Sequence, residues 1–203
     1  IIDVNRFVKQ DKIRAGNFSK LYIIKDKKTN EMFAAKIVRN ETESSYFLPE
    51  VTIHSQTNHP AIIKLIGCSS VDFQNRNRPM IIMEYANNAS LFHILELEKE
   101  GKAIPFFNDT KKLIIVYGLA SAMKYLHSIN ILHGDLKPEN ILIDGFLFPK
   151  ICDFGSSRFI SEKNHCSKPF GTLPYIAPEV WSQSEYSKKV DVYSFALIVY
   201  EIF

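Results

Sequence analysis

The chain has 203 residues, of which 46% are apolar and 23% are charged, a composition typical of a globular protein that buries a sizeable core. Its 25 basic and 22 acidic residues give a net charge of +3, which is too balanced to indicate nucleic acid or an anionic membrane as a partner. Three irregularly spaced cysteines, Cys68, Cys152 and Cys166, indicate neither a disulfide framework nor a zinc site and suit a reducing compartment.

The chain carries no sequence pattern for secretion or membrane insertion. Asp3, Asn5 and Arg6 interrupt any apolar run at the start, and the apolar stretches at 113–123 and 195–200 are too short to cross a bilayer. We therefore expect no signal peptide and no membrane segment in this chain. A cytoplasmic location is expected, either for the chain itself or as the cytoplasmic part of a larger protein.

The first third of the sequence alternates apolar and polar residues, which predicts strands. The segments with this alternation are 7–13, 21–25, 32–38, 64–71 and 79–85. A helix is expected over about 44–56, between the third and fourth of these strands. Residues 1–85 are therefore predicted to form an antiparallel sheet with one helix.

Helical patterns dominate after the polar break near 87–90. The clearest helix is capped by Asn108 or Asp109 and carries apolar residues at helical spacing up to His127. The expected fold class is α+β, with a small sheet-rich lobe, a hinge at 84–88 and a larger, mainly helical lobe over 89–203.

The sharpest motif is HGDLKPEN at 133–140, which is followed by a short apolar run, the turn Asp144-Gly145 and then DFG at 153–155. A hairpin closed at this turn has its open end at Asn140 and Asp153. Two oxygen ligands would therefore meet where a magnesium ion could bridge phosphate groups.

These two motifs resemble the catalytic loop and the Asp-Phe-Gly motif of protein kinases, in their order and spacing. The resemblance implies that Asp135 accepts the proton of the substrate hydroxyl and that Lys137 steadies the moving phosphoryl group. It also implies that Asn140 and Asp153 hold Mg²⁺, with ATP as the co-substrate. A polar loop followed by an ordinary surface hairpin is the alternative, which the agreement of several independent motifs disfavours.

A lysine in the sheet-rich part completes the resemblance. Lys36 lies two residues after Ala34, so both side chains share one strand face, where a small residue can cover adenine while the ammonium reaches phosphate oxygens. Alone, Lys36 would be an ordinary solvated lysine. Its implied partner is Glu50 on the predicted helix, with Glu41 and Glu43 as competitors.

Further ATP contacts are implied by the segment Met83-Glu84-Tyr85-Ala86, which resembles the kinase hinge. The backbone of Glu84 and Ala86 would pair with the adenine edge, Met83 would lie behind it, and Leu142 joins the ATP site. Residues 81–85 can equally be read as a buried strand, and the two interpretations are compatible.

The chain departs from the kinase pattern at two places. The loop that covers phosphate normally carries three glycines, but here Gly16 remains alone, with Arg14 and Ser19 in the outer positions; side chains there restrict backbone approach to phosphate. Gly134 replaces the arginine that usually receives a phosphorylated residue, so that switch loses its main docking charge.

The acceptor is implied by the segment that follows. Lys137 and the pattern G-T-x-x-Y at 171–175, followed by Ala-Pro-Glu at 177–179, favour serine or threonine, and Thr172 is expected to hydrogen-bond near Asp135 and Lys137. The sequence at 191–193 resembles the tyrosine-kinase-like group. The resemblance also implies that the large lobe is incomplete at the C-terminus.

The expected function is therefore that of an ATP- and magnesium-dependent protein kinase acting on serine or threonine of protein substrates, with dual or broad specificity as a variant. The alternative is a pseudokinase or nucleotide-binding scaffold. A small-molecule phosphotransferase has less support, because residues 171–179 resemble a platform for protein substrates. His54, which follows Glu50 by one helical turn, is expected to be a packed, neutral histidine.

Overall fold

The computed structural model describes residues 2–15, 19–39, 47–87, 89–102, 104–161, 164–166 and 168–203. The chain divides into two compact units. The first unit consists of Ile1–Gln56 and Ile63–Tyr85, and the second of Thr57–Ile62 and Ala86–Phe203. No described helix is both long enough and apolar enough to cross a membrane.

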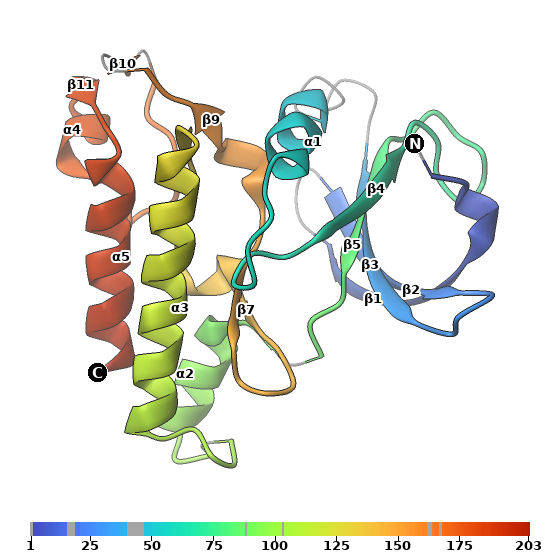
Figure 1. The fold of residues 1–203 in the computed structure, drawn as a ribbon, viewed down its shortest axis with the longest axis horizontal. Helices are drawn as coiled ribbons and strands as arrows, with labels where there is room; N and C mark the ends of the chain where they lie inside the picture. Colours follow the sequence, from blue (N-terminus) through green and yellow to red (C-terminus); the bar gives the residue numbers. More distant parts are fainter. Residues whose placement is uncertain are drawn as a thin grey trace. The chain divides into compact units, whose positions relative to one another are not determined.

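The first unit is built on a five-stranded antiparallel sheet with the strand order β1-β2-β3-β5-β4 (Figure 1). Its strands are β1 (Phe7–Ala15), β2 (Ser19–Asp26), β3 (Met32–Val38), β4 (Leu65–Ser69) and β5 (Met80–Glu84). A 3-10 turn, η1 (Val4–Arg6), precedes the sheet, and the helix α1 (Phe47–Ser55) lies between β3 and β4 in the sequence. The predicted antiparallel sheet with one helix is confirmed, although the expected start of the helix at 44 falls outside the described residues.

The alternation along β3 separates the core of this unit from the face that carries Lys36. Ala35 and Ile37 belong to a buried apolar cluster with residues of β1, β2 and β5. Because successive side chains on a strand point to opposite faces, Ala34 and Lys36 lie on the other face of the sheet. The apolar packing of one face therefore fixes the direction of Lys36.

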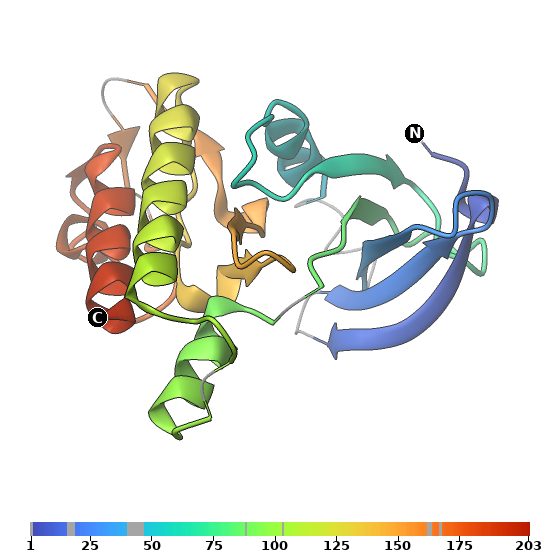
Figure 2. The ribbon, with the colours of Figure 1, turned by 60° about the horizontal axis from the view of Figure 1, so that its bottom comes forward.

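The second unit is mainly helical. Its helices are α2 (Leu91–Lys99), α3 (Asp109–Ser128), α4 (Pro178–Trp181) and α5 (Lys189–Ile202), and α3 and α5 lie side by side in both views (Figures 1 and 2). The side chain of Asn108 accepts a hydrogen bond from the backbone N–H of Lys111. Asn108 is therefore the cap of α3, and Asp109 is its first helical residue.

Three short two-stranded sheets complete the second unit. They are β7 (Ile141–Ile143) with β8 (Pro149–Ile151), β6 (Ile131–Leu132) with β9 (Arg158–Phe159), and β10 (Asn164–His165) with β11 (Glu185–Tyr186). Two 3-10 turns, η3 (Pro138–Asn140) and η4 (Phe154–Ser156), flank the first of them. The sequence predicted only the β7–β8 hairpin, because two-residue strands carry no detectable alternation.

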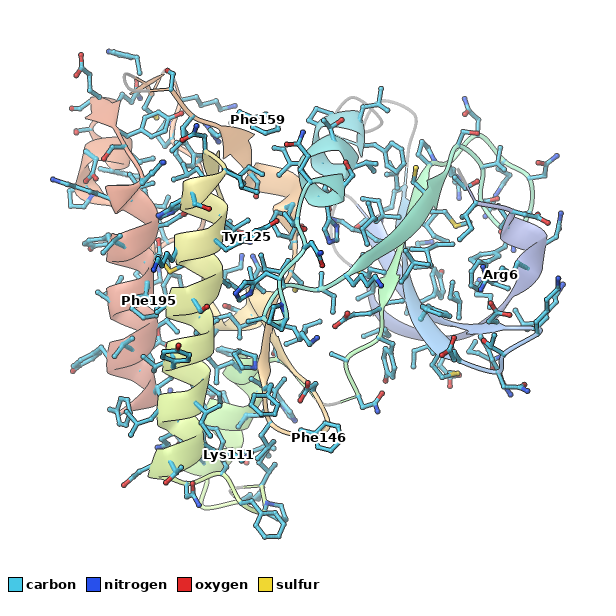
Figure 3. The ribbon with its side chains drawn as sticks, viewed as in Figure 1. Arg6, Lys111, Tyr125, Phe146, Phe159 and Phe195 are labelled. Carbon is cyan, nitrogen blue, oxygen red and sulfur yellow. The ribbon has the colours of Figure 1, made fainter. Side chains whose placement is uncertain are left out.

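Residues 57–62 belong to the second unit, although they lie between two elements of the first in the sequence. The backbone N–H of Asn58 donates to the hydroxyl of Tyr125 at 2.9 Å, and Tyr125 lies on α3 (Figure 3). Ile62 forms an isolated bridge with Ile151 of β8. These bonds anchor the connection between α1 and β4 to the second unit. The sequence had placed this connection in an uninterrupted lobe of residues 1–85.

Candidate active site

The loop between β6 and η3 brings three of the predicted site residues together. One carboxylate oxygen of Asp135, Oδ2, lies 3.0 Å from Nζ of Lys137 and accepts a hydrogen bond of 3.1 Å from Nδ2 of Asn140. The same Nδ2 donates to the backbone oxygen of Asp135 at 2.8 Å. The other carboxylate oxygen, Oδ1, is buried and has no hydrogen-bond partner among the described residues, so it retains its capacity to accept a proton.

The segment around Thr172 contacts this loop. Nζ of Lys137 donates to Oγ1 of Thr172 at 2.6 Å, as the sequence led us to expect. The backbone oxygen of Thr172 in turn accepts from the N–H of Tyr175 at 2.8 Å, and the Tyr175 carbonyl accepts from the hydroxyl of Ser194 at 2.8 Å. Lys137 therefore connects the Asp135 carboxylate to a turn that is itself bonded to α5.

Asp153 follows the β7–β8 hairpin, whose end is hydrogen-bonded to this loop. The N–H of Cys152 donates to the backbone oxygen of Asn140 at 2.9 Å, so the open end of the hairpin connects Asn140 to the residue that precedes Asp153. Asp153 is exposed, has a left-handed backbone with φ 65° and accepts a hydrogen bond from the N–H of Gly155 at 3.4 Å.

His133 fixes the loop to the hairpin through both of its ring nitrogens. Nε2 lies 3.1 Å from the carbonyl oxygen of Cys152, to which it donates, and the N–H of Asp135 donates to Nδ1 at 3.3 Å. This pattern requires the neutral imidazole. The His133 ring also packs edge-to-face on the buried ring of Phe154 at 5.3 Å between centroids.

In the first unit, Lys36 and Glu50 form the ion pair that the sequence suggested. Nζ of Lys36 lies 2.7 Å from Oε1 of Glu50, and the two side chains are only 21% and 10% exposed. Ala34 is buried on the same strand face as Lys36 and pairs with Met83 of β5, which is also buried. The competing Glu41 and Glu43 lie outside the described residues.

Of the other residues that the sequence assigned to ATP, the structure describes the positions of some but not all. Glu84 ends β5, and its N–H donates to the carbonyl of Lys64 at 2.9 Å, so this N–H is engaged within the first unit. Ala86 is buried in the second unit, and Leu142 lies in β7 and is partly exposed. Gly16 lies outside the described residues.

His54 on α1 is packed as expected. Its Nε2 donates to the carbonyl of Ile63 at 2.7 Å, and the side chain is almost fully buried. Burial lowers the pKa of His54 below its usual value; the Ile63 hydrogen bond opposes this shift, while the nearby charge of Lys36 adds to it. The histidine is therefore neutral near pH 7.

Candidate site residues lie in each of the two units, and the similarity of the sequence to one protein family also covers nearly the whole chain. The model of the protein kinase domain matches residues 7–203. This chain belongs to the protein kinase family. Both units contribute to the match, which includes Lys36 and Glu50 of the first unit and Asp135, Asn140 and Asp153 of the second.

Several curated proteins are similar to this kinase chain. An Aurora kinase of Yarrowia lipolytica is 34% identical over 92% of this chain and 48% of its own length. A G-type lectin S-receptor-like serine/threonine-protein kinase of Arabidopsis thaliana is 33% identical over 98% of this chain and 24% of its own length. A cysteine-rich receptor-like protein kinase of the same plant is 38% identical over 77% of this chain. The chain thus spans about half the length of the first of these relatives.

The kinase chain also contains an important residue to which the sequence assigned no role in the site. Asp191, at the start of α5, is 1% exposed. Its Oδ2 accepts from the N–H of His133 and from Nε2 of His127, and its Oδ1 accepts from the N–H of Gly134, all at 2.9 Å. The sequence signal that could have identified Asp191 is a carboxylate in the first turn of a largely apolar helix. An aspartate that is buried there needs strong hydrogen-bond donors, so it must hold other segments in place.

Proposed function

We propose that this chain transfers the γ-phosphoryl group of ATP to serine or threonine of a protein substrate. The observation that carries the proposal is the bonded group of Asp135, Lys137, Asn140 and Thr172. It combines an unpaired carboxylate oxygen, a cation and an amide in one loop, which is what transfer of a phosphoryl group to a hydroxyl requires.

Each member of this group has a distinct role in the proposed reaction. Oδ1 of Asp135 accepts the proton of the attacking hydroxyl, while Oδ2 is oriented by Lys137 and Asn140. Lys137 donates to Thr172 at the wall of the site, and its charge stabilises the phosphoryl group as negative charge spreads over its oxygens. Because these groups are held before substrate binds, little reorganisation is needed during the reaction.

Asn140 and Asp153 are the proposed magnesium ligands. Nδ2 of Asn140 makes both of the hydrogen bonds to Asp135, so the amide oxygen Oδ1 is the atom that faces a cation, and the exposed Asp153 carboxylate supplies a second hard ligand. The described residues contain no group of three or more His, Cys, Asp or Glu side chains that could hold a metal. Magnesium draws most of its ligands from phosphate and water and, when bound, would neutralise phosphate charge.

In the first unit, we propose that Lys36 binds ATP phosphates. The Glu50 carboxylate 2.7 Å away holds the ammonium in place, and the buried Ala34 leaves room for a flat ring on the same face. Glu84, Met83, Ala86, Leu142 and Gly16 remain proposed ATP contacts. We propose further that residues 1–85 and 89–203 act as the two lobes, with the hinge at 84–88.

The choice of serine or threonine rests on Lys137, Thr172 and the names of relatives, some of which are serine/threonine-protein kinases. Membership of the tyrosine-kinase-like group, a cytoplasmic location and the identity of the protein substrate remain predictions. The alternative function is a pseudokinase that binds nucleotide without transfer. It is favoured by the single Gly16 between Arg14 and Ser19, where side chains restrict the approach of phosphate.

Phosphate incorporation into a generic protein substrate tests the proposal. The protein is compared with Asp153→Ala and Asp135→Asn, and with Asp109→Ala as a matched control on the exposed start of α3. We expect the control to retain activity and the two site variants to lose it by a factor of at least about 100. ATP binding by the parent protein without any transfer would favour the pseudokinase, and equal incorporation by all four proteins would exclude Asp135 and Asp153 from the reaction.

A further inference from the structure

Phe170 occupies the space beside Gly134, where the kinase pattern usually has an arginine. Gly134 has a φ of +78°, and a Cβ atom built there would lie 2.9 Å from the carbonyl oxygen of Ser156 and 3.4 Å from the Phe170 ring. Any side chain at this position would require a backbone or ring to move. The aromatic ring and the Ser156 backbone therefore replace a charged group at this point of the loop.

Arg158 lies on the Phe170 ring. Its guanidinium carbon is 3.6 Å from the ring centroid, and Phe170 packs edge-to-face on Tyr186 at 5.3 Å. Arg158 itself is held by β9, where it pairs with Leu132 of β6. Its Nη2 donates to the Ser156 carbonyl at 3.3 Å, while its buried Nε has no hydrogen-bond partner among the described residues.

This arrangement points to the aromatic ring as the main partner of the Arg158 cation. No described carboxylate forms a salt bridge with Arg158 within the usual distance. A guanidinium stacked on a ring gains most when it is partly removed from water, and Arg158 is partly buried. The contact therefore resists displacement of Phe170 from the loop.

The position of Phe170 controls the turn that follows it. Gly171 has a φ of +96°, and a Cβ atom there would lie 3.0 Å from the Gly134 carbonyl oxygen, so the two backbones are in close contact. The next residue, Thr172, accepts the hydrogen bond from Lys137. A shift of Phe170 would move Thr172 relative to Lys137, and with it the cation beside Asp135.

We propose that Arg158 and Phe170 are positioning residues that hold the Gly171–Thr172 turn against the loop of Asp135 and Lys137 without a phosphate on this segment. The proposal rests on the proposed kinase function and names how that site is kept in order. It predicts that phosphorylation is not required for an ordered segment, because a cation stacked on a ring performs the task that a cation bound to phosphate would otherwise perform.

Kinetics of phosphatase-treated protein test the proposal. Arg158→Met and Phe170→Leu are expected to lower kcat/KM for a peptide substrate roughly 3- to 30-fold while leaving KM for ATP unchanged. Arg158→Lys and Phe170→Tyr should restore most of the activity, and the double variant should be no worse than the poorer single variant. Phe159→Leu is the matched control, because Phe159, which Figure 3 labels, is the neighbour of Arg158 on β9 and the residue is half exposed.

Two kinetic outcomes would overturn the proposal. In one, Arg158→Met and Phe170→Leu behave like Phe159→Leu. In the other, phosphatase treatment abolishes the activity of the unmodified protein, which would assign Arg158 to a phosphate instead of the ring.

Hydrogen exchange provides a readout that does not need catalysis. The Tyr175 amide donates to the Thr172 carbonyl at 2.8 Å. Its hydrogen should exchange at least several-fold faster in Phe170→Leu than in the parent protein, and at the parent's rate in Phe159→Leu. Amides of α3 report the global stability of each variant. A protein that transfers no phosphate but shows this pattern would refute the proposed function and support the positioning role. Equal exchange of Tyr175 in both variants would refute the positioning role.

Discussion

In the proposed reaction the Lys36 ammonium binds ATP phosphates, and Glu50 holds it in place, because a lysine with four rotatable bonds is poorly fixed on its own. In Glu50→Gln the ion pair of 2.7 Å becomes a hydrogen bond to a neutral group. A charge-assisted hydrogen bond between two ions is stronger than one to a neutral amide, so the ammonium is held less firmly and kcat/KM for ATP should fall roughly 10-fold. Steady-state kinetics with varied ATP measure the change.

The control for this variant is Glu31→Gln, which removes an exposed carboxylate between β2 and β3 in the same unit. It should leave kcat/KM unchanged. A Glu50→Gln protein with the kinetics of Glu31→Gln would show that the ion pair has no part in nucleotide use.

His54 makes the stability of the protein depend on pH near neutrality. Its pKa is lowered in the folded chain by burial, whereas the unfolded chain binds a proton near the usual value of about 6.5. The unfolded state therefore binds more protons as pH falls through about 6.5, and the free energy of unfolding decreases by up to about 1.4 kcal/mol per pH unit until the lower folded pKa is reached. His59, whose pKa is also lowered by burial, contributes in the same direction.

The substitution His54→Gln tests this link, because glutamine can donate to the Ile63 carbonyl but does not titrate. The variant should be less stable than the parent at pH 7.5 and should lose less stability between pH 7.5 and 5.5, as measured by urea unfolding. The exposed His93 provides the control His93→Gln, which should keep the parent's slope. Identical slopes for all three proteins would contradict the assignment of His54.

At the level of elements, long periodic segments were predictable and short ones were not. The five strands of the first unit and helix α3 matched their predicted positions to within a few residues, because each carries several turns or alternations of pattern. The pairs β6–β9 and β10–β11 have two residues per strand, and their pairing depends on contacts between segments far apart in the sequence. Tertiary packing, not local preference, determines such elements.

Helix α5 anchors the loop of Asp135 through one side chain. In Asp191→Ala the N–H groups of His133 and Gly134 and the ring of His127 all lose their acceptor. Buried donors without a partner are costly, so the free energy of unfolding should fall by roughly 3–5 kcal/mol. Phosphate transfer should be lost under conditions where the variant is still folded, because the loop is no longer fixed.

Urea unfolding and activity at 10 °C measure these two effects separately. Asp109→Ala, at the exposed start of α3, is the control and should change neither. An Asp191→Ala protein that keeps both its stability and its activity would show that the backbone of the loop is held by other contacts.

Across the whole chain, the sequence named the candidate site residues better than the residues that hold them in place. The motifs named Asp135, Lys137, Asn140 and Asp153, and the structure brings the first three into direct contact. The stack of Arg158 on Phe170 was not foreseen, because no motif links residues twelve positions apart in an irregular segment. Sequence motifs nominate candidate reactive groups, whereas the groups that hold them in place are identified only from their packing.

Two neighbouring helices of the second unit each expose large apolar side chains. On α3, Leu113 and Tyr117 are 59% and 78% exposed, and at the end of α5, Tyr200 and Phe203 are 83% and 64% exposed. Single exposed apolar residues are ordinary, but several on neighbouring helices favour association when they form one surface. We therefore expect the 203-residue chain on its own to self-associate as its concentration rises.

Sedimentation velocity of the chain and of the double variant Tyr117→Lys/Tyr200→Lys tests this expectation. Because both side chains are mostly in water, the substitutions should change the free energy of unfolding by no more than about 0.5 kcal/mol, while added charge on the apolar surface should shift the chain towards monomer. Phe106→Lys is the control, since Phe106 is 82% exposed but lies outside both helices; it should leave self-association unchanged. A parent chain that stays monomeric at every concentration, or a double variant that associates as strongly as the parent, would show that this surface does not drive association.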